Sequence, residues 1–326
     1  MRILLSRTDR IGDLILSTPA IATVRRSFPE AHVTMVVSPY NAVVMERNDD
    51  VDELVQLPSQ ISPAAFGSAR HGYDLAIALA PRAVDLKLVG ATRARVRAGY
   101  TYERRWVARL TARLYVNRLM ISEADPELCE RDPGRIVRHE VMQLLDLVAI
   151  AGAHRRVETL RLDLNEADRS VAAELPARPI VFHCGKRWFG AGSTLASTLR
   201  LVERLGSLAP VVVTCARECE DVAPEFERLP GVVRVFRHLP FHQWAGVFER
   251  ACVVVTVDTG ATHVASAVRR PTVVAFEHRY FRLNSQEWAP YGVPNVLVRK
   301  PASEDEDSLQ RFRDEIASGV DELLDA

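Results

Sequence analysis

The stretch Val253–Ala267 constrains the fold more than any other, because a buried run and a helical pattern meet there at one short polar turn. Residues 253–257 are four valines and one threonine, and such β-branched runs are typical of strands buried in a parallel sheet. Asp258-Thr259-Gly260 interrupts the run, and small and apolar residues at helical spacing follow. We therefore expect a strand that passes directly into a helix at the carboxyl edge of a parallel sheet.

This turn predicts a binding site for an anion. The first N–H groups of a helix lack partners and the helix dipole favours negative charge, and ligands of open α/β sheets bind at this edge. We interpret the turn as a cradle for the diphosphate of a nucleotide. A plainer interpretation stays open, in which Asp258 or Thr259 only caps the helix and Gly260 only serves the turn. Since a carboxylate repels phosphate, the Asp258 side chain should face a cap or a sugar hydroxyl.

Strands and helices alternate in both halves of the chain, which indicates βαβ units and parallel sheets. In the first half, the expected strands are 3–6, 33–37, 51–55 and 75–79, and the expected helices are 14–28 and 140–151. In the second half, the expected strands are 179–183, 211–214, 232–235, 253–257 and 272–276, with helices around 244–250 and over 304–325. The 326 residues are enough for two domains. The polar stretch 154–179 is the predicted boundary region.

Composition narrows the function classes. The 42 basic residues equal the 42 acidic ones, so the chain as a whole is not built to bind polyanions. No apolar run approaches the ~18 residues that a membrane span needs, and the N-terminus is expected to form a strand rather than a signal peptide. The five cysteines are scattered. The pair Cys215 and Cys219 allows a metal interpretation, but buried or free thiols in a reducing cytoplasm are favoured.

Asp13 stands where the loop after the first strand becomes a helix, so it is expected at the carboxyl edge of the first sheet. A carboxylate in that place can act as a general base. The alternative is a helix cap, or an acid in the first turn that the helix dipole favours. Pro19 is expected to bend this helix.

Residues 82–118 are strongly basic, with ten lysines and arginines against Asp85 and Glu103. Arg105, Arg109 and Arg113 fall on one stripe of a helix. Its apolar face is supplied by Trp106, Val107, Leu110 and Leu114. Basic amphipathic helices suit anionic membrane surfaces or phosphorylated ligands, although a plain solvated face is the commoner explanation. Nucleic acid is less supported, because the whole chain is neutral.

Two further polar side chains follow strands of the second half. Lys186 comes after the strand at 179–183, and Glu218 after the strand at 211–214. Loops that follow parallel strands converge at one edge, where a lysine can neutralise phosphate and an acid can hold ribose hydroxyls. Taken singly, either residue is as readily explained as a solvated surface charge.

Four stretches resemble glycosyltransferase family nine, the ADP-heptose:lipopolysaccharide heptosyltransferases. The strongest is Asp258-Thr259-Gly260-Ala261-Thr262-His263, which is similar to the signature D-[ST]-G-x-x-H. The others are Arg10–Leu14 with Pro19 and Phe28-Pro29, Asp74–Ile77 through Gly99-Tyr100, and His139-Glu140 with the helix that ends at Gly152. Two donor-side loops depart from the family pattern, at His183–Phe189 and at Phe276–Arg279.

The resemblance implies a GT-B architecture of two Rossmann-like α/β domains, with parallel sheets facing across a cleft. We expect an acceptor-binding domain over residues 1–160 and a nucleotide-sugar-binding domain over 161–326, with the last helix packing back on the first domain. Asp13 becomes the base that takes the proton of the acceptor hydroxyl, and the predicted acceptor-binding residues are Arg10 and Arg82. The predicted donor-binding residues are Lys186, Glu218, Asp258, Thr259, Gly260 and His263.

The function implied is inverting transfer of heptose or a related sugar, without a metal or other cofactor. The donor is expected to be a nucleotide diphosphate sugar, ADP-linked, and the acceptor a saccharide or lipid-linked saccharide of lipopolysaccharide or a related glycan. The expected place is the cytoplasm, with peripheral contact at the inner membrane face and no nucleic acid partner. A nucleotide-sugar epimerase or hydrolase and a non-catalytic nucleotide-sugar-binding protein stay open. An NAD oxidoreductase is disfavoured, because no G-x-G-x-x-G follows the first strand.

Overall fold

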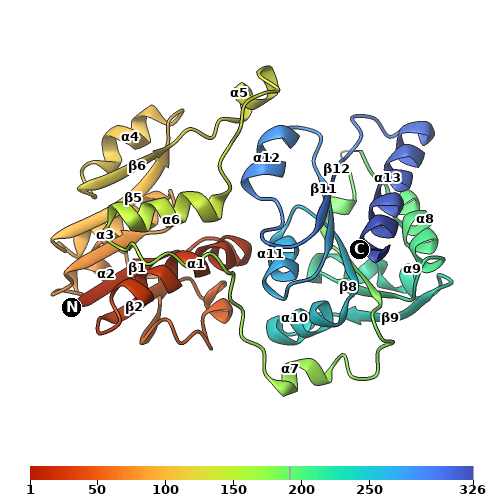
Figure 1. The fold of residues 1–326 in the computed structure, drawn as a ribbon, viewed down its shortest axis with the longest axis horizontal. Coiled ribbons are helices and arrows are strands. Elements are labelled where there is room, and N and C mark those ends of the chain that lie inside the picture. The colour runs from red at the N-terminus through yellow and green to blue at the C-terminus, as the bar shows by residue number, and fades with distance from the viewer. Residues whose placement is uncertain (191, 326) are drawn as a thin grey trace. The chain divides into compact units, whose positions relative to one another are not determined.

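The computed structural model, which describes residues 1–190 and 192–325, divides the chain into two α/β units. Unit 1 is Met1–Asp163 and unit 2 is Leu164–Ala326. This division falls three residues after the boundary predicted from the sequence. In Figure 1, unit 1 runs from red to yellow-green and unit 2 from green to blue.

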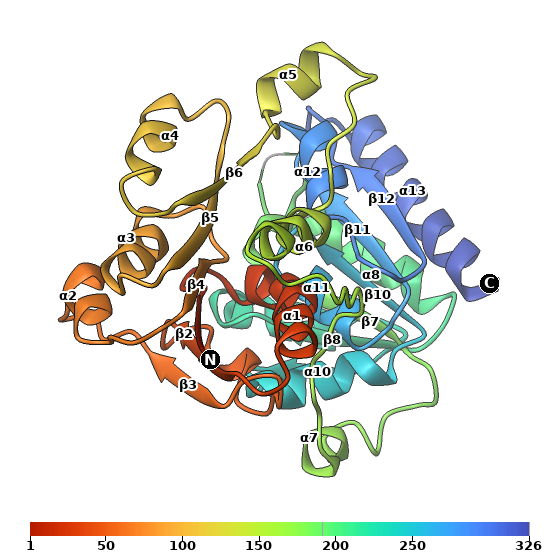
Figure 2. The ribbon, with the colours of Figure 1, turned by 60° about the vertical axis from the view of Figure 1, so that its left-hand side comes forward.

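The sheet of unit 1 has six parallel strands in the order β3-β2-β1-β4-β5-β6. Its strands are β1 (Arg2–Ser6), β2 (His32–Val37), β3 (Glu53–Gln56), β4 (Leu75–Ala78), β5 (Val96–Tyr102) and β6 (Arg118–Ser122). Its helices are α1 (Ile11–Ser27), α2 (Pro63–Ser68), α3 (Ala83–Ala91), α4 (Trp106–Ala112), α5 (Pro126–Arg131) and α6 (Glu140–Ile150). Helices α1 and α6 lie together on one face of the sheet, and α2, α3 and α4 lie on the other (Figure 2).

The sheet of unit 2 also has six parallel strands, in the order β12-β11-β10-β7-β8-β9. Its strands are β7 (Ile180–Cys184), β8 (Val211–Cys215), β9 (Val232–Arg237), β10 (Val253–Val257), β11 (Thr272–Phe276) and β12 (Asn295–Arg299). Its helices are α7 (Glu166–Ser170), α8 (Leu195–Gly206), α9 (Ala223–Glu227), α10 (Phe241–Arg250), α11 (Gly260–Ala267), α12 (Phe281–Glu287) and α13 (Glu306–Asp325). The predicted α/β class with parallel sheets is confirmed.

The last helix, α13, buries its apolar stripe within unit 2. Phe312, Ile316 and Val320 are at most 3% exposed and belong to the same apolar cluster as strands β7, β8, β10 and β11. Their spacing of four residues places them on one side of the helix. The predicted packing of this helix on the first domain stays a prediction.

Helix α1 tolerates a proline in its interior because another group replaces the missing donor. Pro19 has no N–H for the carbonyl of Ile15, four residues earlier. The hydroxyl of Thr18 donates to that carbonyl at 2.7 Å instead. The helix begins at Ile11, three residues before its predicted start, so Asp13 lies inside its first turn.

Helix α4 turns its large apolar side chains outward. Ala112 is buried and Ala108 half-buried, whereas the four larger apolar residues of the segment are exposed. Those four are Trp106, Val107, Leu110 and Leu114. None of the helices in the described ranges is long and apolar enough to span a bilayer.

Gly246 in α10 packs against the backbone of α7, and this contact generates a test of the packing. A Cβ at position 246 would lie 2.3 Å from the carbonyl oxygen of Asp168. Alanine in a helix normally stabilises by about 1 kcal/mol relative to glycine, but overpacking of this kind costs about 1–3 kcal/mol. We therefore expect Gly246→Ala to lower the free energy of unfolding, measured by urea denaturation.

The matched control for this substitution is Gly134→Ala. The nearest atom to a Cβ at position 134 is a carboxylate oxygen of Asp132 at 3.5 Å, an ordinary contact. This control should unfold at the wild-type urea concentration. Equal stability of the two variants would contradict the close approach of α10 and α7.

Candidate active site

The candidate catalytic carboxylate, Asp13, lies at the carboxyl edge of the sheet of unit 1. It is the third residue of α1 and is 7% exposed. Its Oδ2 accepts from Arg10 Nε at 2.8 Å, and its Oδ1 pairs with Arg7 Nη2 at 3.2 Å. Asp13 does not cap the helix, because the N-cap position is Arg10 and no side chain caps it. Two guanidinium groups thus orient a carboxylate that retains further lone pairs for a substrate hydroxyl.

Arg7 is the buried centre of this edge, with 1% of its surface exposed. Its Nε donates to Asp9 at 3.0 Å, and its Nη1 donates to Glu140 at 3.0 Å and to the carbonyl of Leu79. Burial alone would lower the pKa of the guanidinium, but the charges of Asp9, Glu140 and Asp13 together raise it well above its usual range. The cation therefore stays charged, and it joins β1, the end of β4 and α6.

Glu140 at the start of α6 completes the buried cluster. Its Oε1 accepts from Arg7 and from the Tyr100 hydroxyl, the latter at 2.6 Å. Burial raises the pKa of Glu140, while Arg7 and Tyr100 oppose that shift. Burial and the neighbouring Glu140 likewise raise the pKa of Tyr100. The phenol therefore stays protonated and donates a hydrogen bond to Glu140.

A second buried carboxylate, Asp85, lies in the first turn of α3. It is fully buried and accepts from the hydroxyls of Ser6 at 2.6 Å and Thr8 at 3.1 Å. Burial raises its pKa from 3.8 to about 6, and the charge of Asp9 acts in the same direction. The hydrogen bonds to Ser6 and Thr8 oppose that rise without cancelling it.

The two predicted acceptor-binding arginines flank this cluster. The side chain of Arg10 is 68% exposed while its Nε holds Asp13. Arg82, at the N-cap of α3, is exposed, and its Nη1 donates to the carbonyl of Thr8 at 3.3 Å. The structure therefore brings Arg10, Arg82 and Asp13 to one edge, around the loop after β1.

In unit 2, the turn between β10 and α11 has the predicted form. Thr259 is the N-cap of α11, but its side chain makes no capping hydrogen bond. Its hydroxyl donates to the carbonyl of Val257 at 3.2 Å, and the Thr262 hydroxyl donates to the same carbonyl at 3.3 Å. Thr259 therefore does not cap the helix through its side chain, so this part of the plainer interpretation is wrong. His263, in the first turns of α11, is buried.

Lys186 and Glu218 both lie at this same edge. Lys186 begins the short 3-10 helix after β7, and Glu218 lies in the 3-10 helix Arg217–Val222 after β8. Both side chains are exposed. Because β10, β7 and β8 are consecutive neighbours in the sheet, their loops are adjacent, as the sequence predicted.

Sequence reasoning missed the residues that tie these loops together. Arg187 Nη1 donates to Asp258 Oδ2 at 3.0 Å and also to the Asp258 carbonyl. The buried Lys300 Nζ donates to Glu277 Oε1 at 2.8 Å and also to the Arg187 carbonyl. These contacts connect the two loops that depart from the family pattern, and they give Asp258 a cation as its partner. The signal available in the sequence was Arg187, a second cation directly after the candidate Lys186.

One further titratable group close to this edge, His183, is buried. His183 on β7 contacts Thr214 Oγ1 at 2.9 Å, and burial lowers its pKa to about 4, so the ring is neutral near pH 7. All five cysteines are free thiols and buried. Within residues 1–190 and 192–325, no group of three or more His, Cys, Asp or Glu side chains is arranged to hold a metal ion.

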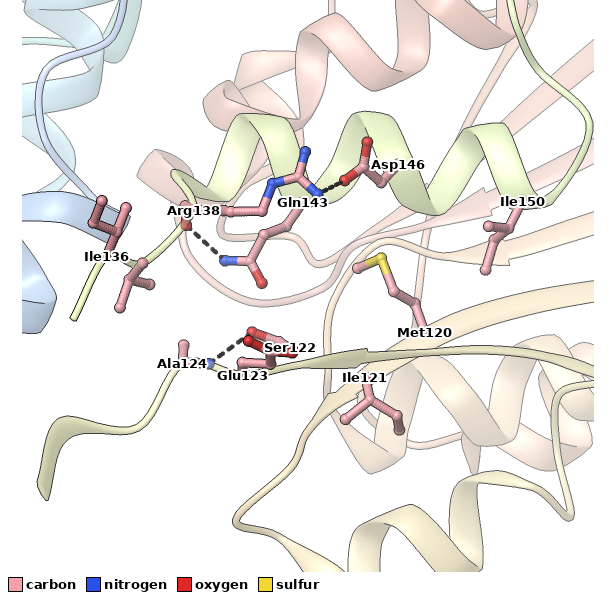
Figure 3. A pocket seen from close by; sticks show the side chains of 11 residues that line it. Met120, Ile121, Ser122, Glu123, Ala124, Ile136, Arg138, Gln143, Asp146 and Ile150 are labelled. Carbon is pink, nitrogen blue, oxygen red and sulfur yellow. Dashed lines mark hydrogen bonds and ion pairs between the residues drawn. The ribbon is translucent and has the colours of Figure 1, made fainter. Parts of the chain in front are cut away.

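A separate hollow of about 340 Å³ lies between β6 and α6 in unit 1. Figure 3 shows Met120 and Ile121 on the strand opposite Gln143, Asp146 and Ile150 on the helix. Asp13 is not among its lining residues. The hollow is therefore distinct from the carboxylate cluster.

The buried Asp85 generates a prediction about stability and pH. The pKa of Asp85 in the folded chain, about 6, exceeds the ordinary 3.8, so the folded chain favours the protonated carboxyl. The contribution of Asp85 to stability is therefore complete below about pH 4 and is lost as the pH rises through 6. Relative to Asp85→Asn, the wild-type protein should lose about 3 kcal/mol of unfolding free energy between about pH 4 and pH 7. Urea denaturation of both proteins across this range measures the difference, and parallel pH curves would contradict the assignment.

Comparisons with known proteins agree with the motifs. The family model described as "Glycosyltransferase family 9 (heptosyltransferase)" matches residues 210–312. Lipopolysaccharide heptosyltransferase 3 of Escherichia coli K12 is 21% identical over 294 residues, which cover 83% of this chain and 82% of the relative.

Two solved structures share the fold along the whole chain. A glycosyl transferase family 9 protein from Veillonella parvula has a TM-score of 0.77 at 18% identity, covering 99% of this chain and 97% of that one. E. coli heptosyltransferase WaaC with ADP-2-deoxy-2-fluoro heptose has a TM-score of 0.71 at 20% identity, covering 99% of each chain. The predicted GT-B class is therefore confirmed. By its motifs, its relatives and its fold, this chain resembles glycosyltransferase family 9 and is a glycosyltransferase of heptosyltransferase-like type.

Proposed function

We propose that the protein transfers heptose or a related sugar from an ADP-linked donor to a saccharide acceptor, with inversion and without a metal. The observation that carries the proposal is the turn Asp258–Gly260, which joins a central parallel strand to a helix whose N-cap side chain, that of Thr259, makes no capping hydrogen bond. The ligand named for the WaaC structure, ADP-2-deoxy-2-fluoro heptose, supports the choice of donor. The acceptor would belong to lipopolysaccharide or a related glycan, in the cytoplasm.

Asp13 would act as the general base. Its carboxylate would take the proton from an acceptor hydroxyl while that oxygen attacks the anomeric carbon from the side opposite the diphosphate. The bond from the anomeric carbon to the diphosphate would break, and its electron pair would leave with the nucleotide. The arginines on both oxygens of Asp13 hold the carboxylate in place, and a positioned base of this kind contributes about 10²–10⁴-fold to the rate.

Unit 2 would stabilise the charge that develops on the leaving diphosphate. The N–H groups at Thr259 and Gly260 and the ammonium of Lys186 would donate to the diphosphate, and removing one such donor typically costs about 3–4 kcal/mol of transition-state stabilisation. Glu218 would hold the ribose hydroxyls. Asp258 and His263 would lie near the transferred sugar, with Arg187 reducing the repulsion between Asp258 and phosphate.

The role of Asp13 is tested by Asp13→Asn, which keeps the shape and removes the base. We expect kcat to fall about 10²–10⁴-fold with ADP binding unchanged, measured by sugar transfer and by thermal shift. The matched control is Asp49→Asn, which removes an exposed carboxylate of the same unit that does not contact Arg7. Full turnover in Asp13→Asn, or an equal loss in Asp49→Asn, would rule out the proposed base.

The donor site is tested by a thermal-shift screen with ADP, UDP and GDP in the presence of a chelator. ADP should stabilise most, following RT ln(1 + [L]/Kd). Lys186→Met should weaken ADP binding about tenfold or more, since a charge-assisted hydrogen bond contributes about 1.5–3 kcal/mol. The control Lys87→Met, an exposed lysine of unit 1, should bind ADP as the wild type does. Product formation from the donor without acceptor would instead support a hydrolase or epimerase.

A further inference from the structure

The helix α4 and the turn after it expose an unusual set of large apolar side chains. The exposed fractions are 67% for Trp106, 53% for Val107, 59% for Leu110 and 77% for Leu114. Trp106, Val107 and Leu110 lie within α4 at helical spacing, so they share one face, and Leu114 follows in the turn after the helix. The helix meets its own unit through small residues, Ala108 and Ala112, which is why the larger side chains face solvent.

The same segment is densely basic. Residues 104–118 contain five arginines and no lysine, aspartate or glutamate. Those arginines are Arg104, Arg105, Arg109, Arg113 and Arg118. In the part of the chain that the structure describes, none of the five forms an ion pair with a carboxylate. Their charge is therefore available to a partner.

Cationic and apolar groups meet in one place on this surface. A shallow hollow of about 170 Å³ is lined by Trp106, Leu110, Arg109 and Arg113. The guanidinium groups of Arg104 and Arg105 lie 5.4 and 5.1 Å from the ring centre of Tyr102. These cation–π contacts hold both charges beside the helix start.

We propose that this surface, formed by residues 104–114, docks on an anionic lipid bilayer. The arginines match the charge of lipid phosphates, and the tryptophan and leucines supply the apolar groups that enter the headgroup region. A nucleic acid would use the charge but would not account for two exposed leucines and a valine. The inference deepens the proposed use of an acceptor that belongs to lipopolysaccharide or a related glycan, and it rests on that proposal for its purpose. Vesicle binding is nevertheless measurable without any substrate.

The experiment is co-sedimentation of the full chain with phosphatidylcholine vesicles that contain or lack phosphatidylglycerol. The wild type should bind only the anionic vesicles, and high salt should weaken the binding. Each arginine near such a surface strengthens binding about fivefold, so joint replacement of Arg105, Arg109 and Arg113 by Gln should weaken it at least about tenfold. Joint replacement of Trp106 and Leu110 by Gln should also weaken it.

Matched controls distinguish binding through this surface from non-specific electrostatic or hydrophobic binding elsewhere on the protein. Joint replacement of Arg200, Arg204 and Arg228 by Gln removes the same charge from exposed positions of unit 2. Val233→Gln and Ile61→Gln remove exposed apolar groups elsewhere. These controls should bind vesicles as the wild type does. All variants should keep the wild-type melting temperature and ADP stabilisation, so a failure of lipid docking is distinguishable from a failure of donor binding.

A spectroscopic readout places the contact on α4. Trp106 is the exposed tryptophan, whereas Trp188 is buried and Trp244 and Trp288 are half-buried. Brominated lipid should quench the fluorescence of the wild type and spare that of Trp106→Phe. Absence of binding to anionic vesicles, wild-type binding by the α4 variants, or tighter binding to an oligonucleotide than to vesicles would each overturn the proposal.

Discussion

The buried guanidinium of Arg7 is the interaction on which the first unit's edge depends. It reaches Asp9 in its own loop, Asp13 on α1, the end of β4 at Leu79 and Glu140 on α6. A buried cation with several acidic partners adds little net stability compared with an apolar core, but removing one partner is costly because the others are then unmatched. The contribution of Arg7 is to fix the position of Asp13, because the contacts of Arg7 with its other partners leave the guanidinium in one place.

At the carboxyl edge of the sheet in unit 2, the feature that matters is an acidic residue beside two cations. The proposed binding of a diphosphate requires hydrogen-bond donors and cations, yet the turn after β10 carries the acidic Asp258. Arg187 pairs with that carboxylate and with its backbone carbonyl, while Lys186, the preceding residue, stays exposed. Of these two adjacent cations, Arg187 neutralises the acid, and Lys186 would remain available to the proposed diphosphate.

The sequence predicted those parts of the fold that follow from local pattern. The strand Val253–Val257 has the predicted bounds, and Lys186 and Glu218 lie after neighbouring strands because loops of a parallel sheet share an edge. The Arg7 cluster was not predictable, because two of its partners, Leu79 and Glu140, lie 72 and 133 residues away and no spacing rule links them to Arg7. Periodicity also found one apolar face in α4, but it does not tell whether such a face turns toward a core or toward solvent.

Lys300 has a consequence for how this site can change. The ammonium group of Lys300 donates to Glu277 after β11 and to the Arg187 carbonyl after β7. The free energy of each loop conformation therefore depends on the other loop. Substitutions in contacting residues of one network are non-additive, and an exchange in one loop will therefore depend on the residue present in the other. Variation of donor preference in this chain should accordingly proceed through paired exchanges of residues, as coevolution, rather than through single replacements.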